Sequence, residues 1–259
     1  MGPFFKGTDA FVAKSFGISY IISPLNLGTL SLEKLVIAID GPAASGKSTT
    51  AKLVASRLGY LHVDTGAMYR AIALKVLRSR CQPSDEEAVG RLMRSTHVEL
   101  RDQSGVLHVF LDNEDVTEEI RSVEVTRAVS AVSSYRKVRE AMVREQRGMG
   151  KGGGIVLEGR DIGTVVFPDA DLKFYMVAGI DARAHRRRQE LKEKGVDANL
   201  QDLRKEIEDR DRRDSTRAES PLKKADDAIE LDTSTMTIEE QVDFVLRRVR
   251  QKVDDVKGL

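Results

Sequence analysis

The sequence is poor in cysteine, in net charge and in long apolar runs, and each shortage excludes a class of protein. Its single cysteine, Cys81, cannot form a disulfide within the chain, which favours a reducing compartment and a cytoplasmic protein. No stretch reaches the ~18 apolar residues of a membrane-spanning helix, so we expect no membrane partner. The formal net charge of +1 provides no overall basic field, so we do not expect nucleic acid as a partner.

The first 31 residues differ from the rest, since they are rich in phenylalanine and carry few charges. They lack the basic start and small-residue cleavage site of a secretory signal, and they contain no arginine, which argues against an organelle transit peptide. We interpret residues 1–31 as a poorly ordered N-terminal extension, or as the product of a start codon assigned too far upstream. The remaining residues are enough to bury a substantial core.

One motif dominates the sequence. Residues Gly41–Ser48 read GPAASGKS and match the phosphate-binding P-loop, G-x-x-x-x-G-K-[ST]. The apolar run Leu35–Ile39 before it predicts a buried parallel strand, and Ser48–Leu58 after it predicts a helix that Gly59 closes. Glycines let the backbone approach an anion closely, and successive N–H groups at a helix start surround phosphate oxygens. The motif therefore predicts a nucleoside triphosphate site.

The loop also assigns roles to individual residues. Lys47 is expected to reach the β- and γ-phosphates, and the Ser48 hydroxyl is expected to bind Mg²⁺. The residues assigned to the triphosphate and its metal are Gly41, Pro42, Ala43, Ala44, Ser45, Gly46, Lys47, Ser48 and Thr49.

Further apolar segments alternate with helical ones along the chain. With Leu35–Ile39 they make five expected strands, the others being Tyr60–Val63, Ile155–Leu157, Leu172–Val177 and Ala228–Leu231. Helices are expected over Ala67–Leu77, over Ala182–Lys194 with Asp181 as cap, from Asn199 to Arg217, and from Thr237 to about Val253 behind a capping box with Glu240. This alternation predicts an α/β P-loop NTPase with a doubly wound, five-stranded parallel sheet.

One segment breaks the α/β pattern. Residues 97–101 and 106–111 alternate apolar and polar side chains around a turn, which predicts an antiparallel hairpin. A helix is expected before it, over Ser84–Arg94, and another after it, over Val116–Gln146 with an interruption near Ser133. We therefore divide the chain into a core of residues 32–83 and 152–255 and an inserted subdomain of residues 84–151.

The P-loop alone does not define the reaction, because switch GTPases, motors and small-molecule kinases share it. The guanine-reading motif Asn/Thr-Lys-x-Asp is absent, and a single core leaves no room for a motor's partner domains. Arginines instead occur at several separate sites, which favours a kinase, since phosphoryl transfer depends on positive charge around the moving group. Arg70 and Arg160, each just after a strand, fit a clamp for an acceptor phosphate. The helical residues 183–217 fit a lid that excludes water.

Four motifs besides the P-loop complete the pattern: DTGAMYR at Asp64–Arg70, EGRDIGTVVFPDA at Glu158–Ala170, AHRR at Ala184–Arg187 and RDRRDSTR at Arg210–Arg217. With them, the chain from about Lys34 to Lys252 resembles the bacterial-type cytidylate kinases of the nucleoside monophosphate kinase group. The resemblance implies transfer of the γ-phosphate of ATP to CMP or dCMP with Mg²⁺, giving ADP and CDP or dCDP. It also implies that residues 84–151 bind the monophosphate and that the protein is a cytoplasmic monomer.

The resemblance assigns site residues in groups. Thr65, Arg70 and Arg160 are expected to hold the acceptor ribose and phosphate, and Ser130, Arg139 and Asp161 to read the base. Arg210, Asp214 and Arg217 are expected to act from the lid, and Arg186 to bind ATP. The residues expected to be catalytic are Lys47, Arg160, Arg210 and Arg217.

The base assignment also has a physical rationale. A carboxylate such as Asp161 accepts from the exocyclic amine of cytosine, whereas uracil presents an acceptor there. A site left with unpaired polar groups rejects the analogue strongly, so we expect CMP to be preferred over UMP. Two other interpretations stay open at this point. One is a P-loop kinase of a small alcohol such as shikimate, or of dephospho-coenzyme A, with Asp40 or Asp64 as base. The other is a nucleotide-dependent switch protein.

Overall fold

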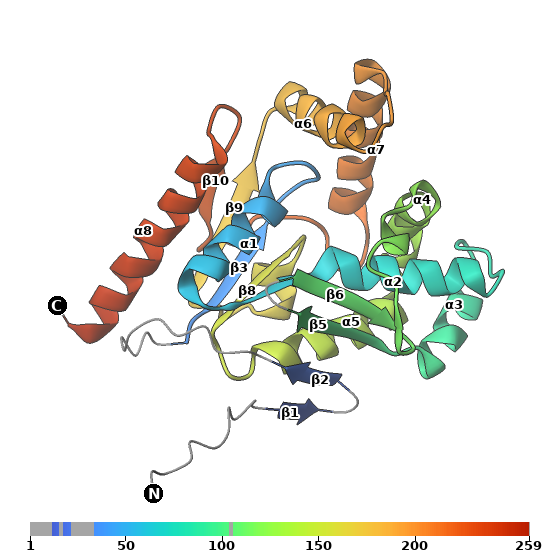
Figure 1. The fold of residues 1–259 in the computed structure, drawn as a ribbon, viewed down its shortest axis with the longest axis horizontal. Helices are drawn as coiled ribbons and strands as arrows, with labels where there is room; N and C mark the ends of the chain where they lie inside the picture. The colour runs from blue at the N-terminus through green and yellow to red at the C-terminus, as the bar shows by residue number, and fades with distance from the viewer. Residues whose placement is uncertain (1–11, 16–17, 22–33, 104–105, 259) are drawn as a thin grey trace, which may run out of the picture.

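The computed structural model describes residues 12–15, 18–21, 34–103 and 106–258. Its centre is a sheet of five parallel strands in the order β10-β9-β3-β8-β4 (Figure 1). The strands are β3 (Val36–Asp40), β4 (Leu61–Asp64), β8 (Ile155–Gly159), β9 (Leu172–Val177) and β10 (Ile229–Asp232). The predicted five-stranded parallel sheet is therefore confirmed, with strand bounds that differ by at most two residues.

Helices cover both faces of this sheet, as a doubly wound fold requires. On one face, α1 (Lys47–Leu58) and α8 (Ile238–Lys257) bury Ile37 and Ile39 of β3. On the other face, α2 (Thr65–Arg78) packs on Ala38. Because successive strand residues point to opposite faces, the continuous apolar run of β3 serves both clusters at once.

Local signals fix the ends of several helices. Gly59 closes α1 in the left-handed conformation, at φ 65°, as predicted. The capping box of α8 is also confirmed, because Thr237 Oγ1 accepts from the Glu240 N–H at 3.3 Å and the Glu240 carboxylate accepts from the Thr237 N–H at 2.8 Å. None of the helices in the described ranges has an apolar stretch that could span a bilayer.

The expected lid is a helical pair beyond the sheet, α6 (Ile180–Glu193) and α7 (Leu200–Thr216), packed against each other (Figure 1). Asn199 caps α7 as predicted. The prediction that Asp181 caps α6 is wrong. The helix begins two residues earlier, at Ile180 with Gly179 as its cap, because the Gly179 carbonyl already accepts from the Arg183 N–H at 3.1 Å. The Asp181 carboxylate instead pairs with Arg204 of α7 at 2.8 Å.

The inserted segment contains the predicted hairpin, in which β5 (Val98–Gln103) pairs with β6 (Val106–Leu111), and a third strand, β7 (Glu114–Asp115). Its helices are α3 (Glu86–Leu92), α4 (Val123–Val132) and α5 (Arg136–Gly150), with short 3₁₀ turns at Met93–Ser95 and Glu119–Arg121. The break between α4 and α5 was predicted.

The prediction of a helix from Val116 is wrong, because Val116 and Thr117 stay joined to β6 and α4 begins at Val123. The Val116 N–H donates to the Val109 carbonyl at 2.8 Å, and Thr117 Oγ1 accepts from the Val109 N–H at 2.9 Å. The insertion shares one apolar cluster with α2, in which Val98 and Leu111 pack with Ile72. The division into core and insertion stays a prediction.

Residues 12–15 and 18–21 form a short antiparallel pair, β1 (Val12–Ser15) and β2 (Ile18–Ile21), and β2 lies beside β5 (Figure 1). The sequence did not predict this pairing. The rest of the expected N-terminal extension lies outside the described residues.

Candidate active site

The acidic residues at the carboxyl ends of three neighbouring strands meet at one edge of the sheet. Register pairs Glu158 of β8 with Asp64 of β4 on one side and with Ile39, next to Asp40, on the other. In open α/β sheets this edge binds ligands. The P-loop lies at the same edge, between β3 and α1.

Two glycines of the loop hold conformations that no other residue fits. Gly41 has φ +150°, and a Cβ built there would lie 2.1 Å from the Met176 carbonyl oxygen. Gly46 has φ +94°, and its Cβ would lie 2.9 Å from Oε1 of Gln241. Both glycines of the motif are therefore required by the backbone and its neighbours.

The lysine of the loop is buried before any phosphate binds. Lys47 is 5% exposed, and its ammonium donates to the Pro42 carbonyl at 2.6 Å. Burial, and after it the positive charge of Arg160, lowers the pKa of Lys47 to about 7. Phosphate anions at this position would supply the negative charge that the site lacks.

Ser48 and Glu158 form the part of the site that suits a metal ion. Ser48 Oγ donates to Glu158 Oε2 at 2.6 Å, and Glu158 Oε1 contacts His62 Nε2 at 3.1 Å. The described residues contain no group of three or more His, Cys, Asp or Glu side chains that could cage an ion. Mg²⁺ commonly keeps several waters and takes few protein ligands beside substrate phosphates, so the residues present fit it.

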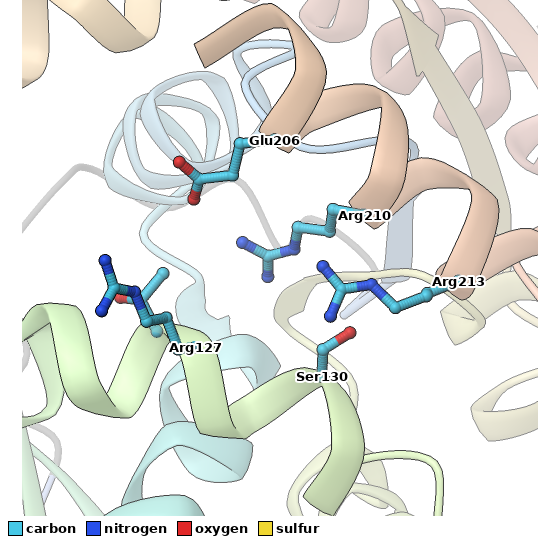
Figure 2. Close-up of a pocket in the computed structure, with 6 residues that line it drawn as sticks. Arg127, Ser130, Glu206, Arg210 and Arg213 are labelled. Atoms are coloured by element: carbon cyan, nitrogen blue, oxygen red, sulfur yellow. The ribbon is translucent and has the colours of Figure 1, made fainter. Parts of the chain in front are cut away.

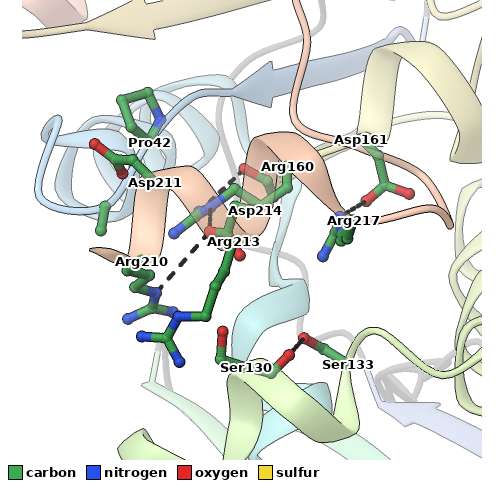
Figure 3. Close-up of polar contacts among 12 residues, drawn as sticks. Pro42, Ser130, Ser133, Arg160, Asp161, Arg210, Asp211, Arg213, Asp214 and Arg217 are labelled. Carbon is green, nitrogen blue, oxygen red and sulfur yellow. Dashed lines mark hydrogen bonds and ion pairs between the residues drawn. The ribbon is translucent and has the colours of Figure 1, made fainter. Parts of the chain in front are cut away.

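Arg160 and Arg210 lie together around one carboxylate, that of Asp214 (Figure 3). Arg160 Nε donates to Asp214 Oδ2 at 2.8 Å, and Arg210 Nε lies 4.0 Å from the same oxygen. Burial, and after it the charge of Arg160, lowers the pKa of Arg210 to about 10. Three of the residues assigned to the acceptor and the lid thus form one cluster that would stabilise further negative charge.

Two more acceptor residues lie at the end of β4. Arg70 Nη2 donates to Asp64 Oδ2 at 2.8 Å, while Asp64 Oδ1 accepts from the Ala67 N–H and caps α2. Thr65 Oγ1 donates to the Glu158 carbonyl at 2.7 Å. The DTGAMYR motif therefore anchors its own arginine beside the P-loop.

A second cluster, the buried polar pocket, lies where α5, α7 and the end of β8 meet. Arg139 and Asp161 are 3% and 4% exposed and form an ion pair. Arg217 Nη2 lies 3.8 Å from the other Asp161 oxygen (Figure 3). Three polar atoms here are buried without a hydrogen-bond partner among the described residues: Arg139 Nε, Arg217 Nη2 and Tyr69 OH. Ser130 Oγ is unpartnered among them as well, one turn before Ser133, whose carbonyl accepts from Arg139 Nη1 at 3.1 Å.

Unpaired buried polar atoms are rare in folded proteins, and several in one place indicate a polar ligand. Tyr69 was not assigned a role from the sequence. Its ring lies under the Arg139 guanidinium at 5.3 Å, and burial raises the pKa of its hydroxyl to about 12, so it stays a donor. Its place in the DTGAMYR motif is the feature of the sequence that could have assigned Tyr69 to the site.

Two arginines of α6 hold the P-loop from the lid side. Arg186 bonds Thr233, whose hydroxyl donates to the Ser45 carbonyl at 2.8 Å. Arg183, to which the sequence assigned no role of its own, pairs with Asp211 of α7 and donates to the Ala43 carbonyl at 3.4 Å. The lid helices are therefore tied to the donor loop.

An open pocket of about 320 Å³ lies between α4 and α7 (Figure 2). We call it the mouth pocket, and its lining residues are Thr126, Arg127, Ser130, Glu206, Arg210 and Arg213. Its walls come from α4 of the inserted segment and from α7 of the lid, and it shares Arg210 with the cluster around Asp214.

Asp40 is not free to act as a base. It is 4% exposed, and its two oxygens accept from the N–H groups of Ile162 and Gly163 at 2.9 and 2.7 Å. Burial raises its pKa from 3.8 to about 6, although both hydrogen bonds lower it. Asp40 therefore positions the EGRDIG turn beside the P-loop.

The raised pKa of Asp40 predicts a pH dependence of stability. Because the pKa of Asp40 is higher in the folded protein than in the unfolded chain, its protonated carboxyl favours the folded state. This contribution to the unfolding free energy is complete below about pH 4 and is lost as the pH rises through 6. We expect the unfolding free energy to lose about 1.4 kcal/mol between pH 5 and pH 7.5 through this group. Urea unfolding of the wild type and of Asp40→Asn at both pH values measures it. An identical pH dependence in the two proteins would refute the expectation.

The fold and the site together define a class. A five-stranded parallel sheet carries a P-loop at its carboxyl edge. Arg183 of the helical pair contacts that loop, and Arg139 of the insertion and Arg160 pair with carboxylates near the end of β8 and on α7. These are the parts of a P-loop phosphotransferase.

Comparison with known proteins narrows the class. Residues 37–251 match the family model described as cytidylate kinase. A protein named cytidylate kinase from Bacillus pumilus (strain SAFR-032) is 51% identical over 214 residues, which cover 83% of this chain and 95% of the relative. One of the same name from Geobacillus sp. (strain WCH70) is 49% identical over 217 residues, covering 84% and 97%. The chain belongs to the cytidylate kinase family, and it is a kinase with ATP as phosphate donor.

Among solved structures, a gluconokinase from Sinorhizobium meliloti 1021 aligns with a TM-score of 0.46 and 10% identity, over 87% of this chain and 97% of that one. A similarity this low carries no argument about fold or function.

Proposed function

We propose that this protein transfers the γ-phosphate of ATP to CMP or dCMP, giving ADP and CDP or dCDP. The observation that carries the proposal is the buried polar pocket, with its Arg139–Asp161 pair and its unpaired donors, beside a P-loop at the same sheet edge. A cytosine matches this set, since Asp161 can accept from the exocyclic amine and arginine can donate to the ring nitrogen or carbonyl. Ser130 and Tyr69 supply further donors.

The acceptor needs positioning rather than deprotonation. A 5′-phosphate is mostly ionised near pH 7, its second pKa being about 6, so its oxygen can attack without a base. The two aspartates that an alcohol kinase would use are both engaged, Asp40 by two backbone N–H groups and Asp64 by Arg70 and the start of α2. This disfavours a hydroxyl acceptor.

Arginine must then hold two like-charged phosphates together. Arg160 and Arg70 fit the acceptor phosphate, because their planar forks bind phosphate oxygens in pairs. In this structure they bind Asp214 and Asp64 instead, so we expect substrate to exchange these carboxylates for phosphate oxygens. Lys47 and Arg210 are placed to stabilise charge on the phosphoryl group in transfer.

The lid role of α6 and α7 follows from the same contacts. Arg210, Asp214 and Arg217 all lie on or just after α7, and the resemblance to cytidylate kinases implies that Asp214 lies near the sugar. When α7 moves onto both nucleotides it excludes water, which prevents wasteful hydrolysis of ATP. The cytoplasmic location, the monomeric state and the absence of a nucleic-acid partner remain predictions of the sequence.

We further propose that Mg²⁺ binds at Ser48 and, through water, at Glu158. The ion would neutralise charge on the ATP phosphates. We expect Ser48→Ala to raise the Mg²⁺ concentration for half-maximal activity about tenfold, with a smaller change in the KM for CMP. Titration of Mg²⁺ at fixed ATP and CMP measures this. Ser56→Ala, an exposed serine of the same helix, is the matched control, and an unchanged Mg²⁺ requirement in Ser48→Ala would exclude the assignment.

The switch interpretation can be separated from the kinase by ADP release from ATP with and without CMP. We expect ADP release to be slow without CMP and at least a hundredfold faster with CMP. One CDP should form for each ADP released. A switch protein would bind ATP and show no such rise.

A further inference from the structure

The mouth pocket carries more positive charge than a nucleoside monophosphate requires. Three of its lining side chains are arginines and only Glu206 is acidic (Figure 2). Within the described part of the chain, neither Arg127 nor Glu206 has a hydrogen-bond or ion-pair partner. Arg213 uses only its Nε, which donates to the Asp209 carbonyl at 3.2 Å. Arg127 and Arg213 are exposed, so their free guanidinium groups can turn to an anion in the pocket, and guanidinium binds phosphate oxygens in pairs.

The place of the pocket indicates which part of the acceptor faces it, given the proposed function. Ser130 lines the mouth pocket, and it is joined to the buried polar pocket that we assign to the base through Ser133, whose hydroxyl donates to the Ser130 carbonyl and whose own carbonyl accepts from Arg139. Arg210 belongs to both the mouth pocket and the clamp around Asp214 and Arg160 that we assign to the phosphate end. The sugar lies between base and phosphate in a nucleotide. Its 2′ and 3′ positions therefore face the mouth pocket.

We propose that the mouth pocket is a subsite for a second phosphate group on the acceptor sugar. Cytidine bisphosphates that carry a 2′- or 3′-phosphate besides the 5′-phosphate are then acceptors, and Arg127 and Arg213 hold the added group. When Arg160 turns from Asp214 to the 5′-phosphate, Arg210, whose Nε lies 4.0 Å from Asp214 Oδ2, still offsets the charge of that carboxylate. Glu206 opposes the added charge and limits the affinity.

The reaction is the same as for CMP. The bond between the γ-phosphorus and the bridging oxygen of ATP breaks, and an oxygen of the 5′-phosphate forms the new bond to phosphorus. ADP leaves with the bridging oxygen, the second phosphate is unchanged, and no oxidant or further reactant is needed.

The test compares cytidine 3′,5′-bisphosphate with CMP as acceptor, by coupled ADP release and by ³¹P NMR of the diphosphate product. We expect kcat/KM for the bisphosphate to equal or exceed that for CMP. Arg127→Ala should lower the ratio of the two values at least tenfold, as expected for the loss of charge-assisted hydrogen bonds. Glu206→Gln should raise the ratio several-fold. Arg121→Ala, an exposed arginine just before α4, should leave it unchanged.

The possible outcomes distinguish failure of the second-phosphate subsite from failure of the proposed kinase function. Phosphorylation of CMP without phosphorylation of the bisphosphate overturns the subsite and leaves the proposed function standing. A bisphosphate activity that Arg127→Ala and Glu206→Gln do not alter also overturns the subsite. So does a loss in Arg127→Ala that affects both acceptors equally, since that would indicate a role in lid closure alone. Absence of CMP phosphorylation overturns the proposed function itself.

Discussion

Arg160→Ala should lower kcat by about 10² to 10³ with both CMP and dCMP, the range observed when one preorganised donor to a transition-state charge is removed. The expectation follows from the position of Arg160, which bonds Asp214 on α7 and adjoins the end of β8. The substitution removes a positive charge beside the phosphoryl group in transfer. It also removes a hydrogen bond between the lid and the core. Steady-state kinetics with each acceptor at saturating ATP measure the effect.

Two further variants serve as controls for the Arg160→Ala result. Arg160→Lys keeps the charge but loses the planar fork, so it should recover only part of the activity. Arg212→Ala is the matched control on α7, because Arg212 is exposed and pairs only with Asp209 one turn away, a contact worth little. A loss in Arg160→Ala confined to the KM for ATP would contradict an acceptor clamp.

Asp161→Asn should abolish the preference for cytosine. The buried carboxylate pairs with Arg139, and we assign it to accept a hydrogen bond from the exocyclic amine of cytosine. The amide nitrogen of asparagine would instead donate to the carbonyl that uracil has in place of the exocyclic amine. We expect kcat/KM for CMP to fall at least a hundredfold while the value for UMP changes little, because sites built around a polar contact discriminate by large factors.

The same substitution should also destabilise the protein. Loss of one partner from a buried ion pair leaves an uncompensated charge, which costs about 3 to 5 kcal/mol. Thermal unfolding therefore has to accompany the kinetics, at a temperature where the variant is folded. Asp209→Asn, a half-buried aspartate of α7 that pairs with the exposed Arg212, should change neither property. Retention of the full CMP preference in a folded Asp161→Asn protein would exclude Asp161 as the base reader.

What the sequence predicted well depends on neighbours along the chain. The P-loop, the Gly59 helix end and the Thr237 capping box are signals within a few residues, and all three are present as expected. The five strands were recognisable because a buried parallel strand is a continuous apolar run. The start of α6 was misplaced, since Asp181 pairs across to Arg204.

What the sequence could not give depends on distant residues. Ser48 meets Glu158, and Arg139 meets Asp161, only because strand order brings the ends of β3 and β8 together and α5 beside them. No spacing within the chain specifies these pairs. The motifs assigned several of these residues to one site, whereas the burial of unpaired atoms such as Ser130 Oγ needed the fold.

The central claim is that the donor loop and the cytosine-reading pocket form one two-substrate site. The most direct test is the rate of diphosphate formation from CMP, dCMP, UMP and AMP with ATP and Mg²⁺, with the product identified by ³¹P NMR. We predict that CMP and dCMP are phosphorylated and that UMP and AMP are slower in kcat/KM by at least two orders of magnitude. Phosphorylation of UMP or AMP faster than of CMP would contradict the assignment of the buried polar pocket to cytosine.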